Sequence, residues 1–152
     1  MIALDTNILI YADTSADPND RHAKAVKIFS RLMEPEVIAC IPLQVLGEFI
    51  NVCRHKNILS LQLAANRLVN YAKVFQTPHT LLEDQIAASI LSAGHKLQFF
   101  DALIITVAAR AGAKLLLSED MQDGLEVEGL RVVNPFVAGN AKWIDSVIDR
   151  AR

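Results

Sequence analysis

The chain has 152 residues, 52% of them hydrophobic, and a formal net charge of −2. This length and composition fit one domain with a full core, covering residues 1–152. The net charge argues weakly against a nucleic-acid protein unless several acids cluster in a metal site. Setting aside four of the 17 acids leaves 13 against 15 Lys and Arg, so the remaining surface would be mildly basic.

The two cysteines, Cys40 and Cys53, both lie in apolar segments and match neither a disulfide framework nor a zinc-binding spacing. We interpret them as buried thiols in a reducing compartment. No apolar stretch is long and charge-free enough to cross a membrane, and no basic region precedes the first apolar run. The sequence therefore predicts a cytoplasmic protein with no membrane association.

The first apolar run, residues 1–4, is too short for a helix and predicts a buried strand that ends at Asp5. In open α/β sheets, ligands bind at the carboxyl ends of the strands. Asp5 has a purely structural alternative, which is to cap a helix that begins near Ile8. A site role is the stronger interpretation because three more acids fall in equivalent places along the chain.

Residues 13–20 form a polar loop, and Asp20 is placed to cap a helix that runs to about Met33. On the outer side of this helix lie Lys24, Lys27 and Arg31. A solvated helix face explains these three residues more simply than an RNA-contacting stripe.

Residues 36–41 predict a second buried strand, and Pro42 suits the first turn of a helix that runs to about Lys56. Glu48 falls at the edge of the apolar face of this helix. The apolar face itself comprises Val45, Phe49, Val52 and Cys53. A lone acid on a helix is as often solvated as functional, so Glu48 gains weight only from the other acids.

The middle of the chain predicts three more helices. The first is capped by Ser60 and covers residues 61–71, and a short strand at residues 74–75 follows it. The second covers residues 81–93, and its first-turn acids are interpreted as structural. The third runs to about Ala111 and has Asp101 at its N-cap. Capping and a site role are compatible for Asp101, since a capping carboxylate keeps free lone pairs.

The last part of the chain predicts a buried strand at residues 114–117, an acidic loop at 118–124, a strand at 130–133 and a carboxyl-terminal helix. Strands that are continuous apolar runs and alternate with helices indicate a parallel sheet covered on both faces. In such a sheet, strand carboxyl ends and the amino ends of the following helices share one edge. The acids expected at this edge are Asp5, Glu48, Asp101, Asp120 and Asp123.

Carboxylates that lie close together repel and raise one another's pKa, and a divalent cation removes that penalty. With only oxygen ligands and no Cys/His cluster, Mg²⁺ or Mn²⁺ is the expected ion. Such ions suit phosphodiester hydrolysis, in which the metal activates a water and stabilises the leaving oxygen.

The chain resembles the PIN-domain ribonucleases, most closely the VapC-type toxins of bacterial toxin-antitoxin pairs. Four segments carry the resemblance: I-A-L-D-T-N-I-L-I-Y-A at 2–12, L-G-E-F at 46–49, F-F-D-A-L-I at 99–104 and L-L-L-S-E-D-M-Q-D-G at 115–124. It implies a three-layer fold, with a central, mostly parallel sheet of about four to five strands between helices. It also implies an RNA substrate, a homodimer and an antitoxin whose tail covers the acidic pocket.

By this resemblance, the metal-binding and catalytic acids are Asp5, Glu48, Asp101 and Asp120. Asn7 and Ser118 correspond to polar neighbours that orient the acids. The extra acid Asp123 leaves the fourth ligand ambiguous. We expect Asp120 to be the ligand, because Asp123 precedes Gly124 in a turn-like pair and its side chain suits local backbone bonds.

Two other interpretations are open. A phosphatase of the haloacid-dehalogenase type also begins with an acid after its first strand, but it needs a second aspartate where this chain has Asn7. A non-catalytic PIN-like module would bind RNA or a protein, yet it has no use for a repelling acid cluster. For the partner, we expect an exposed groove formed by Phe49, Cys53 and the helix after Ser60.

Overall fold

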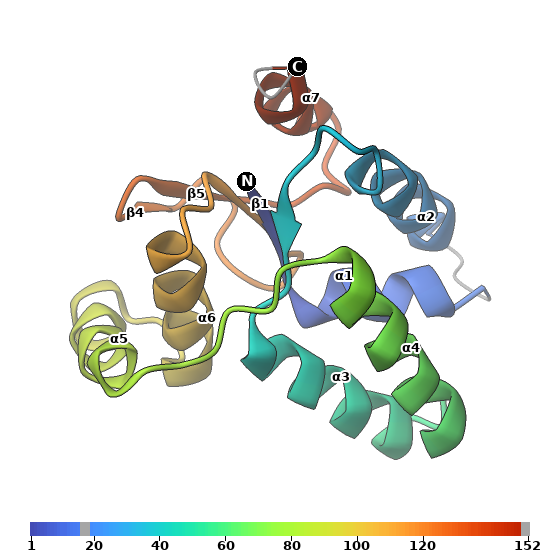
Figure 1. Cartoon of the computed structure of the whole chain (residues 1–152). Helices are drawn as coiled ribbons and strands as arrows, with labels where there is room; N and C mark the ends of the chain where they lie inside the picture. Colours follow the sequence, from blue (N-terminus) through green and yellow to red (C-terminus); the bar gives the residue numbers. More distant parts are fainter. Residues whose placement is uncertain (16–18, 150–152) are drawn as a thin grey trace.

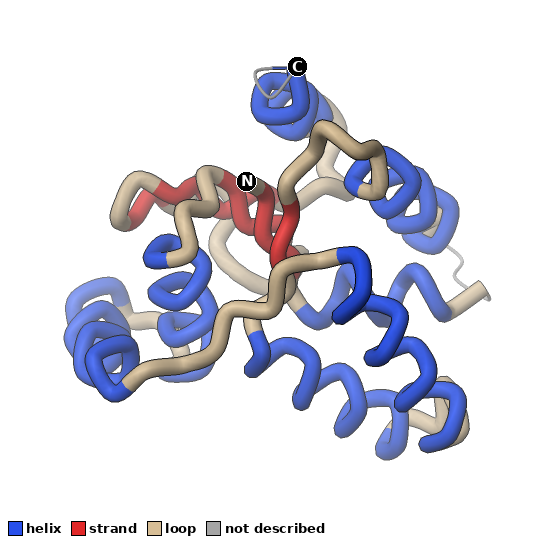
Figure 2. Tube along the Cα trace, in the orientation of Figure 1, coloured by secondary structure: helices blue, strands red, loops and turns tan. Residues whose placement is uncertain are grey.

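The computed structural model describes residues 1–15 and 19–149, in which a central sheet is surrounded by helices (Figures 1 and 2). The strands are β1 (Ile2–Leu4), β2 (Ala39–Cys40), β3 (Leu115–Leu117), β4 (Glu126–Val127) and β5 (Leu130–Val133). The helices are α1 (Thr6–Asp13), α2 (Arg21–Leu32), α3 (Leu43–His55), α4 (Leu61–Val74), α5 (Leu82–His95), α6 (Phe99–Arg110) and α7 (Ala141–Asp149).

The strand order is β2-β1-β3-β5-β4, and all neighbours are parallel except the β4–β5 pair. The central strand β1 pairs Ala3 with Cys40 on one side and with Leu116 on the other. Every residue of β1 and β3 is buried, as expected for strands covered on both faces. The predicted mostly parallel sheet is confirmed.

Helices cover both faces of this sheet. Helix α6 packs against β5, and α5 packs on α6, whereas α7 packs against β3 from the opposite face (Figure 1). Helix α1 begins at the end of β1 and contacts both α2 and α3. This arrangement confirms the predicted three-layer α/β architecture. None of the described helices is both long and apolar enough to span a membrane.

The second predicted strand is shorter than residues 36–41, because only Ala39 and Cys40 pair with β1. Beyond β2 there is a single bridge, in which the amide of Gln76 donates to the Ala39 carbonyl at 3.1 Å. The strand predicted at residues 74–75 is wrong. Val74 is the last residue of α4, and the Phe75 amide still bonds to the Tyr71 carbonyl at 2.8 Å, so helical hydrogen bonding continues there.

Three further expectations need correction. Asp20 precedes α2 as predicted, but its φ is +58° and its side chain makes no capping bond. Strand β4 was not predicted, because two residues with one exposed and one buried side chain give no strand pattern. The groove expected around Phe49 and Cys53 does not exist, since both side chains are fully buried beneath α4, where Tyr71 packs its ring on Phe49 at 5.8 Å.

Candidate active site

Asp5 lies at the carboxyl end of β1 and is only 6% exposed. One carboxylate oxygen accepts a 2.7 Å bond from the Thr6 amide, so Asp5 does cap α1, which begins at Thr6 and not near Ile8. The other oxygen accepts bonds from Asn7 Nδ2 at 3.0 Å and from Ser118 Oγ at 2.7 Å. Capping and a site role therefore coexist in this residue.

Burial raises the pKa of Asp5 to about 6, and the hydrogen bonds from Ser118 and Thr6 lower it only in part. The negative charges of Glu48 and Asp101 raise this pKa further. These electrostatic effects place three predicted acids within interaction range of one another. Such mutual repulsion is relieved when a cation binds.

Glu48 reaches this edge from the second turn of α3. Its two oxygens accept bonds from Thr6 Oγ1 and Gln44 Nε2, both at 2.9 Å. The Gln44 bond follows from the helix, because residues four apart lie on the same face. The Thr6 bond was not predicted. The only signal for it in the sequence is a small polar residue between two site residues, Asp5 and Asn7.

Asp101 was predicted at an N-cap, but the N-cap of α6 is Gln98 and Asp101 lies in the first helical turn. Burial, followed by the charges of Glu48 and Asp120, raises the pKa of Asp101. Its carboxylate accepts no hydrogen bond from the part of the chain that the structure describes. The lone pairs of Asp101 therefore remain open to a ligand.

Asp120 and Asp123 lie in the same loop but in different surroundings. Asp120 is exposed, and its charge acts on Asp101. Asp123 instead accepts a 2.8 Å bond from the Asn134 amide and two 3.0 Å bonds from Asn140 Nδ2. The side chain of Asp123 is thus used to hold the loop after β5, which favours Asp120 as the fourth acid of the site.

A second polar group beside the site was missed in the sequence. Glu119 forms an ion pair with Arg21 at 3.0 Å and accepts a short hydrogen bond from the Tyr11 hydroxyl. Burial, and then Glu119, raises the pKa of Tyr11 to about 12. The Glu119 amide also donates to Asn7 Oδ1 at 3.1 Å. These contacts attach the loop that carries Asp120 to α1 and α2.

The donor set suits a hard divalent cation, since it consists of carboxylates with no basic side chain bonded to them. Among residues 1–15 and 19–149, no three His, Cys, Asp or Glu side chains converge closely enough to form a ready-made cation site. Mg²⁺ commonly keeps several waters and binds through one or two carboxylates. The acids therefore fit such an ion by their chemistry, although they are not gathered around a single point.

A cavity of about 480 Å³ opens next to Glu48. Its other lining side chains are mostly polar or small: Gln44, Gly47, Asn51, His79 and Thr80. Glu48 therefore forms part of the wall of this cavity.

Acids from four separate segments lie at the carboxyl edge of a mostly parallel α/β sheet, the edge at which such folds bind their ligands. The family model of the PIN domain matches residues 2–122 of the chain. The chain therefore belongs to the PIN-domain family. A comparison with curated proteins gave no match.

Solved structures share the fold. VapC20 of Mycobacterium tuberculosis, a sarcin-ricin loop cleaving toxin, is 20% identical with a TM-score of 0.66, over 79% of this chain and 90% of that one. A toxin-antitoxin complex from Klebsiella pneumoniae is 21% identical with a TM-score of 0.64, and the match covers 89% of this chain and 98% of that one. VapBC2 of Rickettsia felis, bound to a promoter DNA fragment, is 16% identical with a TM-score of 0.63, and the match covers 87% of this chain and 97% of that one.

Proposed function

We propose that this protein is a metal-dependent endoribonuclease that hydrolyses RNA phosphodiester bonds. The observation that carries the proposal is the convergence of acids at one sheet edge, where the charges of Glu48 and Asp101 act on Asp5 and those of Glu48 and Asp120 act on Asp101. Membership of the PIN-domain family supports the same conclusion. A non-catalytic binding module would not need to keep repelling acids together.

Asp101, Asp5, Glu48 and Asp120 would hold Mg²⁺ or Mn²⁺. When bound, such an ion activates a water and stabilises the leaving oxygen of the phosphodiester. The protein's own part is to fix the acids in place. Ser118 and Asn7 hold one oxygen of Asp5, while Thr6 and Gln44 hold Glu48. Polar neighbours of this kind set the rotamer of a ligand and strengthen its binding.

The test is cleavage of a labelled RNA by the purified protein with Mg²⁺, with Mn²⁺ and in excess EDTA. Cleavage should require the metal and should fall by orders of magnitude in Asp101→Asn, which removes charge where the ion is held. Glu83→Gln, a change of an exposed acid on α5, is the matched control and should cleave normally. Wild-type cleavage that persists in EDTA would reject the mechanism. RNA binding without cleavage in any metal would favour the non-catalytic module.

We further propose that the enzyme is the toxin of a type II toxin-antitoxin pair, with a small antitoxin protein as its partner. The support is the shared fold with a VapC toxin and with two toxin-antitoxin complexes. The test is a neighbouring reading frame for a small protein with a basic DNA-binding amino half. Its purified product should form a complex with this chain and suppress RNA cleavage.

A homodimer is also proposed. Helix α5 carries three exposed aliphatic side chains at intervals of one turn, Leu82, Ile86 and Ile90, which suit contact with a second copy. Light scattering after size exclusion should give twice the chain mass, and Ile86→Glu should give the monomer mass. A wild-type monomer at high concentration would refute the dimer.

A further inference from the structure

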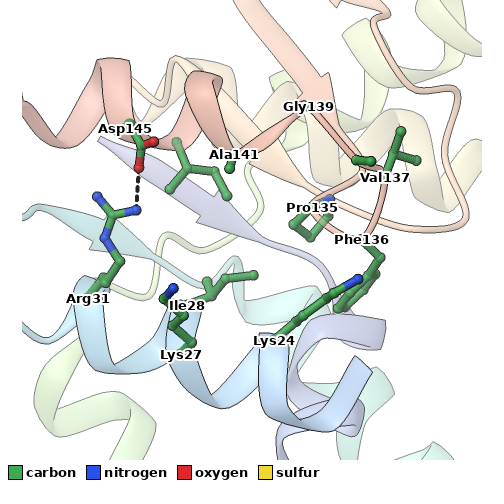
Figure 3. Close-up of a pocket in the computed structure, with 12 residues that line it drawn as sticks. Lys24, Lys27, Ile28, Arg31, Pro135, Phe136, Val137, Gly139, Ala141 and Asp145 are labelled. Atoms are coloured by element: carbon green, nitrogen blue, oxygen red, sulfur yellow. Dashed lines mark hydrogen bonds and ion pairs between the residues drawn. The ribbon is translucent and has the colours of Figure 1, made fainter. Parts of the chain in front are cut away.

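A second pocket, of about 340 Å³, lies between α2, the loop after β5 and the start of α7 (Figure 3). Its volume falls in the range of roughly 300–1,000 Å³ that is usual for small-ligand sites. Helix α2 contributes the basic side chains and the buried Ile28. The facing wall is largely apolar and includes Phe136 and Ile144.

The pocket has an excess of positive charge. Its charged lining residues are three bases, Lys24, Lys27 and Arg31, and one acid, Asp145. Arg31 is paired with Asp145 across the pocket (Figure 3). Lys24 and Lys27 are exposed and form no ion pair within the described residues. They lie one helical turn apart, so both ammonium groups are available to an anionic ligand.

The pocket lies at the same sheet edge as the acids. The strand order places the loop after β5 next to the loop after β3, and the Ser118 amide donates to the Val133 carbonyl at 3.1 Å. Phe136 packs its ring edge-to-face on Tyr11 at 5.2 Å, and the Tyr11 hydroxyl bonds to Glu119, the residue before Asp120. A polymer that runs along this edge from the acids toward the loop after β5 would reach the pocket.

The wall of the pocket is preformed. Asp123 holds both ends of the loop after β5 through Asn134 and Asn140. Within the loop, the Phe136 amide donates to Asn134 Oδ1 at 3.0 Å, and Asn140 Nδ2 donates to the Asn134 carbonyl at 2.9 Å. Such a network fixes the shape of the apolar wall before a ligand arrives.

We infer that this pocket binds one nucleotide of single-stranded RNA, at a subsite separate from the carboxylates. The inference rests on the proposed ribonuclease function. Lys24 and Lys27 would contact successive phosphates, and the base would lie on the apolar wall beside Phe136. Single-strand sites combine basic side chains with an aromatic or apolar platform in this way. An acidic protein segment would also satisfy the charge, but RNA is favoured because the pocket continues the edge where cleavage is proposed.

The experiment measures fluorescence anisotropy of a labelled eight-nucleotide single-stranded RNA without divalent metal, using Asp101→Asn as the parent so that the RNA stays intact. The double variant Lys24→Gln/Lys27→Gln should bind roughly 20-fold more weakly at 0.1 M salt. The slope of log K against log salt should fall in magnitude by about 1.4, since each single-strand phosphate contact contributes about 0.7. Val137→Asp adds negative charge at an exposed position of the wall and should also weaken binding.

The matched control is Lys73→Gln/Lys96→Gln, which removes the same charge from exposed lysines outside the pocket. It should keep both the affinity and the salt slope close to those of the parent.

Equal losses in the two double variants would overturn the subsite, because they would indicate only general charge attraction. Preferential binding of a poly-glutamate peptide, lost in Lys24→Gln/Lys27→Gln while RNA binding is unchanged, would assign the pocket to an acidic protein instead. A parent that binds no RNA also overturns the subsite. Cleavage by the wild type then decides separately whether the ribonuclease proposal stands.

Discussion

Ser118 donates a 2.7 Å hydrogen bond to Asp5 although 113 residues separate the two in the sequence. Both side chains are buried, and the bond joins the ends of the adjacent strands β1 and β3. Because this bond stabilises the ionised carboxylate, it lowers the pKa that burial raises. Ser118 is thus the main counterweight to the desolvation of Asp5.

Replacing Ser118 should therefore affect both stability and ionisation. Ser118→Ala should destabilise the fold by about 1–3 kcal/mol, because a buried acceptor loses a donor. It should also move the ionisation of Asp5 to higher pH, which NMR titration of the Asp5 carboxyl carbon would measure. Ser89→Ala, which removes an exposed hydroxyl bonded to the Ile86 carbonyl, is the control. An unchanged Asp5 titration would contradict the assigned role of Ser118.

The pH dependence of stability should carry the signature of Asp5. Its pKa is about 6 in the folded protein against an ordinary 3.8, so the unfolded chain releases this proton first. In the absence of metal, this group should lower the free energy of unfolding by about 3 kcal/mol as the pH rises from about 4 to about 6. Urea unfolding in EDTA should give a smaller loss for Asp5→Asn over that interval. Identical pH profiles for the wild type and Asp5→Asn would reject the raised pKa.

Divalent metal should reverse this loss of stability. A ligand that binds only the folded state at 100 times its Kd adds about 2.7 kcal/mol. The melting temperature at pH 7 should therefore rise in millimolar Mn²⁺ or Mg²⁺, and Asp101→Asn should reduce the rise. Glu83→Gln should retain the full rise, since it lies outside the acid cluster. No rise in the wild type would count against metal binding at these acids.

The two aspartates of the acidic loop should give different phenotypes. Asp120→Asn should lower RNA cleavage at saturating Mg²⁺ about tenfold more than Asp123→Asn, equivalent to about 1.4 kcal/mol. Asp123→Asn should instead lower the melting temperature, because Asn134 and Asn140 then share one amide oxygen in place of a charged carboxylate with two. Greater damage to cleavage in Asp123→Asn would transfer the role of fourth acid to that residue.

Asp84 should be important for stability and not for catalysis. Its carboxylate accepts two bonds from Arg110, at 2.8 and 2.9 Å, and one from the Leu81 amide at 2.8 Å. Burial acts to raise the pKa of Asp84, but these bonds outweigh it and the pKa is lowered. Asp84→Asn should cost about 2 kcal/mol, a value moderated by the exposure of Arg110. Differential scanning calorimetry should show that this cost disappears when the pH falls below the Asp84 pKa. The same measurement should show little cost for Glu83→Gln, which changes the neighbouring exposed acid.

The continuous apolar runs of the sequence were sufficient to predict β1, β3 and β5, because strands buried on both faces leave no other pattern. The acids at their ends were predictable for the same reason, since parallel strands share a carboxyl edge. The Asp-Gly pair predicted local backbone bonds for Asp123, but its carboxylate instead accepts bonds from Asn134, 11 residues away, and Asn140, 17 residues away.

The features that the sequence did not predict all depend on contacts between residues far apart in the chain, which local sequence patterns do not encode. Thr6 donates to Glu48 across 42 residues, and Tyr11 donates to Glu119 across 108. The buried position of Phe49 depends on α4 packing over it, which helix periodicity alone does not reveal. Lys24 and Lys27 were interpreted as a solvated face because the wall opposite them comes from a loop more than 100 residues later.

The central position of β1 has a consequence for the order in which the protein is made. Strand β1 leaves the ribosome well before β3 (Leu115–Leu117), the strand with which it pairs, and Asp5 meets Ser118 only after β3 has been made. At roughly 5–20 residues per second, synthesis of the 113 residues from Thr6 through Ser118 takes on the order of 6–23 s. Asp5, Glu48 and Asp101 are therefore all synthesised before the strand that aligns them. A PIN domain with this topology gains its complete acidic edge only after β3 and the loop that follows it have been translated.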